Sequence, residues 1–290
     1  MSGSREDWQT FKVGLKSAPP ETAFVLLRVM GERLSLEVDP ELAIEDASDG
    51  DGLIVAGAAL MVRATRVRGM DTAERVDDHN WVPYFANRER AEQILRAAVR
   101  LRPESGLGAA WFSATAIDSD DEVKSEAAKV LGQASDVPIS GYSKLLSANT
   151  EKWGGSHQAM WQVARAYASV RPPWTSALVA KAHYEQWLYL ELMDDRPEAA
   201  KEAELYFREP AIRDELTQIS RATSDAASAD PYETVYAHDV LAAVLAQASM
   251  AKAAAAHLRQ VGSFGDPALL TGGPWWQRAL GRISSGLPLW

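Results

Sequence analysis

Three prolines recur at nearly equal intervals, and this recurrence most constrains the fold of the chain. Pro103, Pro138 and Pro172 stand 35 and 34 residues apart, and each follows a segment with a helical pattern. A proline ends a helix because it lacks an N–H and its ring clashes with the carbonyl four residues earlier. The spacing therefore predicts a chain assembled from helical units of similar length.

Apolar residues between these prolines recur at spacings of three and four, the pattern of helices with one buried face. Residues 220–230 are small and polar and predict a loop. Residues 23–38 fit either a helix or a short hairpin that turns at Gly31, and we favour the helix. The pattern predicts helices over residues 53–65, 85–101, 107–117, 123–133, 140–150, 158–170, 174–193, 232–247 and 251–261.

In sequence order, these predicted helices form two consecutive pairs, 107–117 with 123–133 and 140–150 with 158–170. Ala91, Ala98 and Pro103 match the small–small–proline spacing of tetratricopeptide repeats, whose period is 34 residues. The chain resembles a tetratricopeptide-like helical repeat protein. Over about residues 50–210 it is similar to uncharacterised bacterial repeat-domain proteins, on the stretches 152–157 and 182–187. The resemblance implies an all-α, tetratricopeptide-like α-α superhelix of degenerate helix–turn–helix repeats, and it implies no reaction.

Three parts are expected along the chain. Residues 1–48 form an N-terminal helical cap, residues 49–261 the degenerate repeats, and residues 262–290 a C-terminal capping tail. The tail is expected to cover the last repeat, because a terminal repeat exposes an apolar face.

Charge and composition exclude several classes of function. The net charge of −10 argues against a nucleic-acid partner and against docking on anionic lipid, because both need clustered cations. The chain has no cysteine, so disulfides and cysteine-ligated metals are excluded. No apolar segment is long enough to predict a signal peptide or a membrane span, and we expect a cytoplasmic protein. No motif calls for a cofactor or a metal, and neither is predicted.

The sharpest local feature is the Gly154-Gly155 turn, followed by Ser156 as a candidate helix N-cap. One interpretation is structural, a tight turn between helices pinned by a tryptophan. The other is a binding site at this turn and on the helices after it. Its candidate residues are Trp153, His157, Arg165, His183 and Trp187.

We predict a non-catalytic scaffold or adaptor that binds a protein or peptide partner, since repeat arrays present extended concave surfaces. The alternative is a small-molecule-binding protein or enzyme with its site near Gly154-Gly155 and the face shared by His183 and Trp187. A third reading is a structural subunit that forms a homo-oligomer through Trp275, Trp276 and Trp290.

Overall fold

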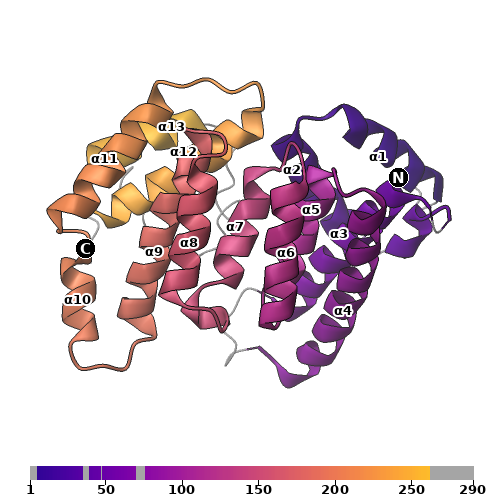
Figure 1. Ribbon diagram of the computed structural model, residues 1–290, viewed down its shortest axis with the longest axis horizontal. Coiled ribbons are helices and arrows are strands. Elements are labelled where there is room, and N and C mark those ends of the chain that lie inside the picture. Colours follow the sequence, from indigo (N-terminus) through magenta and orange to yellow (C-terminus); the bar gives the residue numbers. More distant parts are fainter. Residues whose placement is uncertain (1–4, 35–38, 47, 70–75, 262–290) are drawn as a thin grey trace. The chain divides into compact units, whose positions relative to one another are not determined.

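The computed structural model describes residues 5–34, 39–46, 48–69 and 76–261, and these residues are all-helical (Figure 1). They form thirteen α-helices, and no strand occurs within these ranges. The chain divides into two compact units, residues 1–148 and residues 149–290. The boundary falls inside the predicted pair 140–150 and 158–170. The three predicted parts of the chain remain a prediction.

The first unit is built around α3 and α4, which make its most extensive helix contact. Residues 53–62 of α3 are buried on every side, as expected for the longest apolar run of the chain. Helices α5, α6 and α7 contact one another in turn, and α5 also contacts α7 directly. The elements are α1 (Arg5–Ser17), α2 (Pro20–Leu34), η1 (Pro40–Ala43), α3 (Gly50–Arg68), α4 (Asp78–Leu101), α5 (Gly106–Thr115), α6 (Asp121–Gln133) and α7 (Ile139–Ala148).

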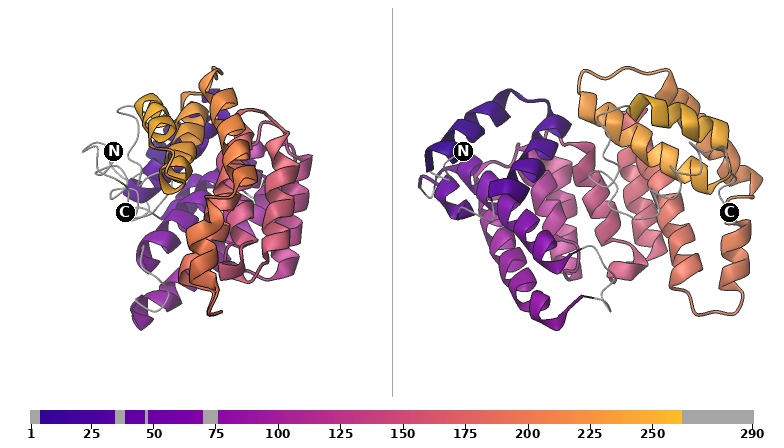
Figure 2. Two further views of the ribbon diagram at one scale, coloured as in Figure 1. Left: turned by 90° about the vertical axis from the view of Figure 1, so that its left-hand side faces the viewer. Right: turned by 180° about the vertical axis from the view of Figure 1, so that it is seen from behind.

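The second unit is organised around α9, which contacts α8, α10 and α12, while α12 packs extensively on α13. Helices α8 and α9 lie side by side in the views of Figures 1 and 2. The elements are η3 (Glu151–Trp153), α8 (His157–Ala168), η4 (Trp174–Ser176), α9 (Ala177–Leu192), α10 (Ala199–Tyr206), α11 (Pro210–Ser224), α12 (Pro231–Gln247) and α13 (Ala251–Val261).

Side-chain caps explain where several helices begin. The carboxylate of Asp49 accepts from the Gly52 amide at 2.9 Å, and that of Asp120 from the Val123 amide at 3.0 Å. Capping oxygens of this kind satisfy amides that have no partner inside the helix. Asp49 and Asp120 therefore fix where α3 and α6 begin.

Most of the predicted helices are confirmed within a few residues of their ends, because each rests on a continuous apolar stripe. Residues 23–34 lie in α2, so Gly31 is helical rather than a turn, and residues 35–38 lie outside the described residues. The loop prediction for 220–230 is wrong at its start, because α11 continues to Ser224. The Ser220 hydroxyl is buried against His257 at 2.8 Å, which holds this turn in the helix.

The predicted capping tail, residues 262–290, lies outside the described residues, and so do Trp275, Trp276 and Trp290. Among the helices that are described, none is both long and apolar enough to cross a bilayer.

Candidate functional site

The turn that leads into α8 is closed by backbone contacts. Gly154 has a left-handed φ of 73°, and the amides of Gly155 and Ser156 donate to the carbonyls of Thr150 and Asn149 at 3.0 and 3.1 Å. A Cβ atom at Gly155 would stand 2.2 Å from the Asn149 carbonyl oxygen. The Ser156 hydroxyl then accepts from the Ala159 amide at 3.0 Å, which confirms the predicted N-cap. The two glycines thus serve a tight turn.

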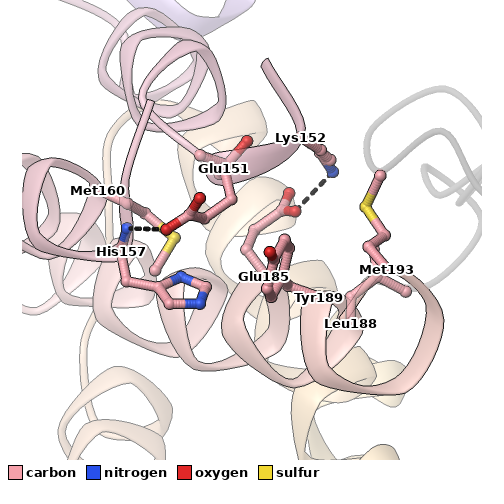
Figure 3. A pocket seen from close by; sticks show the side chains of 9 residues that line it. Glu151, Lys152, His157, Met160, Glu185, Leu188, Tyr189 and Met193 are labelled. Carbon is pink, nitrogen blue, oxygen red and sulfur yellow. Dashed lines mark hydrogen bonds and ion pairs between the residues drawn. The ribbon is translucent and has the colours of Figure 1, made fainter. Parts of the chain in front are cut away.

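A small pocket lies between this turn and α9 (Figure 3). The Lys152 ammonium pairs with the Glu185 carboxylate at 2.6 Å, and the His157 ring stands edge-on to Tyr189 at 4.9 Å between centroids. The cavity measures about 10 Å³, room for about one water molecule. It cannot enclose an organic ligand. The lining residues are Thr150, Glu151, Lys152, His157, Met160, Glu185, Leu188, Tyr189 and Met193.

Helices α8 and α9 meet in a ladder of polar and aromatic contacts. After His157 on Tyr189, the next rung is the Trp161 indole N–H, which donates to the Gln186 side chain at 2.6 Å. Trp161 also stands edge-on to His183, 4.7 Å between centroids. The α8 members are spaced by four residues and the α9 members by three, so each series follows one helix face. The two helices run antiparallel along this ladder.

The last rung gathers four side chains from four helices. His183 Nε2 lies 2.9 Å from Glu215 of α11, and Nδ1 lies 2.9 Å from the Tyr206 hydroxyl of α10. A carboxylate only accepts, so Nε2 carries the proton and the tyrosine hydroxyl donates to Nδ1. The Arg165 guanidinium donates to both carboxylate oxygens of Glu215. Its Cζ atom lies 5.0 Å from the centroid of the Trp161 ring.

The electrostatics of this cluster indicate a structural role. Burial lowers the pKa of His183, although Glu215 opposes that shift. The Arg165 guanidinium beside Glu215 holds the pKa of that carboxyl below its usual value. The imidazole is therefore neutral at pH 7, is only 4% exposed, and has both nitrogens occupied. A general base must reach the proton that it abstracts. His183 instead ties α9 to α10 and α11.

Apolar side chains are exposed at the end of α9. Trp187 packs on Phe207 with ring centroids 6.1 Å apart and remains half-buried, as does Leu188. Leu192 is 71% exposed and Met193 is 47% exposed. We call Trp187, Leu188, Leu192 and Met193 the α9 surface. Its apolar side chains are of the kind that anchors protein interfaces.

The structure distributes the five predicted residues over four places. Arg165 and His183 meet through Glu215, His157 lines the small pocket, and Trp187 belongs to the α9 surface. Trp153 lies in η3 at the turn and is half-buried. The sequence does not predict the partners Tyr206 and Glu215, because the pattern does not predict α10 and α11, the helices on which they lie. The apolar stripe of α11 and Pro210 at its first position could have revealed that helix.

A second polar cluster lies inside the same unit, between α11, α12 and α13. The Nδ1 atoms of His238 and His257 are 2.6 Å apart, and His257 Nε2 is 2.8 Å from the Ser220 hydroxyl. Both histidines are buried. Burial and the neighbouring His238 lower the pKa of His257 to about 4, and burial also lowers the pKa of His238. The folded state therefore holds both rings neutral at pH 7.

We expect acid to destabilise the second unit through this histidine pair. Between pH 6.5 and about 4, His257 binds a proton in the unfolded chain but stays neutral in the folded chain. The free energy of unfolding therefore decreases as the pH is lowered through that window. The loss attributable to His257 is about 3 kcal/mol. Urea titrations at pH 7 and pH 4.5 measure it. A His257→Gln variant should be less stable at pH 7 and should lose less stability on acidification. An unchanged pH dependence would contradict this account.

Comparisons of the chain with models of known protein families, with curated proteins and with solved structures gave no match. In the part of the chain that the structure describes, no three histidine, aspartate or glutamate side chains are placed to hold a metal ion.

Proposed function

We propose that the chain is a non-catalytic, tetratricopeptide-like scaffold that binds a protein or peptide partner on the α9 surface. One observation carries this proposal, the exposure of Leu192 and Met193 at the end of α9, one helical turn after the half-buried Leu188. Contiguous exposed apolar side chains are typical of interaction sites, whereas single ones are common on any protein surface.

Helix packing in the first unit supports the repeat architecture. In a two-helix repeat, the first helix of one unit contacts both its own partner and the first helix of the next unit. Helix α5 contacts α6 and α7 in this way, and α6 contacts α7. Small residues permit the close approach, since a Cβ at Gly141 would stand 2.7 Å from the Cβ of Ala110. Ala91 and Ala98, which carry the repeat spacing, are fully buried.

Charge suggests the chemistry of the partner. Glu191 and Asp195 are exposed beside the apolar side chains of the α9 surface, and the whole chain carries a net charge of −10. Complementary charge accelerates association and selects the partner. We therefore propose a basic segment with at least one aromatic or large aliphatic anchor. The small-molecule alternative receives less support, because the nearby pocket has room for about one water molecule.

The test uses synthetic twelve-residue peptides that combine arginine with tryptophan or leucine, and acidic peptides of the same apolar content. We expect the full chain to bind the basic set. Leu192→Glu should weaken that binding at least about tenfold, because it places a carboxylate at the apolar contact. Val13→Glu is the matched control, since Val13 is also 71% exposed but lies on α1 of the other unit. Equal weakening by both variants, or binding of neither peptide set, would contradict the proposal.

A further inference from the structure

We propose that the first unit binds a phosphate ion between α2, α5 and α7, through Arg28, Trp111 and Lys144. The site belongs to a different unit from the α9 surface and does not depend on the proposed function. It is inferred from three hydrogen-bond donors that three contacting helices bring together, two of which have no acceptor among the described residues.

Helices α2, α5 and α7 contact one another in all three pairs (Figure 1). Phe24 of α2 stacks on Trp111 of α5, with the ring centroids 4.5 Å apart. The Glu21 carboxylate of α2 accepts from the Ser140 amide of α7 at 3.1 Å, and the Ser140 hydroxyl donates to the same carboxylate. These contacts fix which faces of the three helices point toward one another.

Arg28 and Lys144 lie one helical turn further along these faces. Arg28 follows Phe24 by four residues on α2, and Lys144 follows Ser140 by four residues on α7. Each side chain therefore lies on the same helix face as the contact before it. The two cations are close enough to repel each other, because burial and the charge of Arg28 lower the pKa of Lys144 to about 8. The three helices thus bring two positive charges to the Trp111 ring.

Two of these three donors lack an acceptor within the described part of the chain. The indole Nε1 of Trp111 is buried and has no hydrogen-bond partner there. The Lys144 ammonium makes no hydrogen bond or ion pair with any described residue. The Glu21 carboxylate does not supply one, because it is bonded to Ser140 instead. Buried donors without an acceptor are costly and rare in folded proteins. The cluster therefore calls for an acceptor from outside the chain.

The chemistry of the three groups defines that acceptor. An indole N–H, an ammonium and a guanidinium only donate, so the ligand must only accept at the atoms that face them. A phosphate ion carries roughly one to two negative charges at pH 7 and several acceptor oxygens, and it can neutralise both cations. A carboxylate can neutralise only one of them. Because Trp111 is 4% exposed, a small ion fits this site better than a protein segment does.

Nuclear magnetic resonance tests the site in the full chain, because the indole N–H of Trp111 gives its own signal. Trp111→Phe identifies that signal by its loss and keeps a ring to stack on Phe24. We titrate sodium phosphate against sodium chloride at constant ionic strength and pH. The Trp111 signal should shift saturably with phosphate, and should respond to acetate only at concentrations at least about tenfold higher. A signal that phosphate leaves unchanged, or that acetate shifts equally, would overturn the proposal.

A pair of lysine variants tests the role of the ammonium. Lys144→Met should weaken phosphate binding at least about tenfold, because a charge-assisted hydrogen bond is lost. It also removes the repulsion with Arg28, so the variant should fold. Lys129→Met is the matched control, since Lys129 is exposed on α6 of the same unit. Phosphate should raise the Tm of the natural chain and of Lys129→Met, but not that of Lys144→Met. Equal effects of phosphate on all three proteins would contradict the site.

Discussion

Replacing Gly155 with alanine should destabilise the second unit by about 3 kcal/mol. The new Cβ would stand 2.2 Å from the Asn149 carbonyl oxygen, a backbone atom that already accepts from the Ser156 amide. The turn must open to relieve this contact, and crowding of a closed site costs 1–3 kcal/mol or more. Opening also moves Ser156, so the N-cap of α8 weakens. Urea unfolding followed by circular dichroism measures the change.

Gly132 provides the matched control for that experiment. It lies near the end of α6, and a Cβ at that position would meet nothing within 4 Å. Alanine is a better helix former than glycine, so Gly132→Ala should be neutral or should stabilise the protein by up to about 1 kcal/mol. A Gly155→Ala protein as stable as Gly132→Ala would refute the closed turn.

Replacing Asp239 with asparagine should stabilise the protein by about 2 kcal/mol at pH 7. Asp239 is completely buried on α12, and neither carboxyl oxygen has a hydrogen-bond partner. Burial raises the pKa of this carboxyl well above its usual value. An unpaired buried polar group costs about 1–3 kcal/mol, and an acidic one costs more at pH 7, because it must take up a proton to be buried in its neutral form. Asparagine keeps the shape and cannot ionise.

The pH dependence of that gain identifies its cause. Above about pH 4 the unfolded chain releases the Asp239 proton while the folded chain retains it, so wild-type stability falls as pH rises. Asparagine lacks this penalty, and the advantage of Asp239→Asn should therefore grow from pH 4 upward until the folded carboxyl ionises. Urea titrations at pH 4, 5.5 and 7 measure it. A gain that stays constant over this range would show that ionisation plays no part.

The sequence predicts the helices of this chain better than it predicts their partners. An unbroken apolar run identifies α3, periodic apolar residues identify α4 and α12, and polar caps such as Ser156 mark where helices begin. Both signals are local, so one sequence suffices to read them. Helices α10 and α11 were not predicted, because α10 is short and α11 begins within a polar stretch.

The candidate site shows the same limit. The turn and the alignment of His157, Trp161 and Arg165 on one helix face follow from spacing. The contact of His183 with Glu215 joins residues 32 positions apart in sequence, and it depends on how α11 packs beside α9. Periodicity carries no information on such a contact. The exposure of Leu192 is likewise unpredictable, because it depends on which neighbours leave α9 uncovered.

The most direct measurement locates a bound peptide on the full chain. A basic peptide that carries a photoreactive group beside its aromatic anchor is cross-linked to the protein, and the labelled residues are identified by mass spectrometry. We expect labelling concentrated on the second half of α9, at Trp187, Leu188, Leu192 and Met193, and its loss in Leu192→Glu. Labelling spread evenly over both units, or confined to residues 1–148, would contradict it.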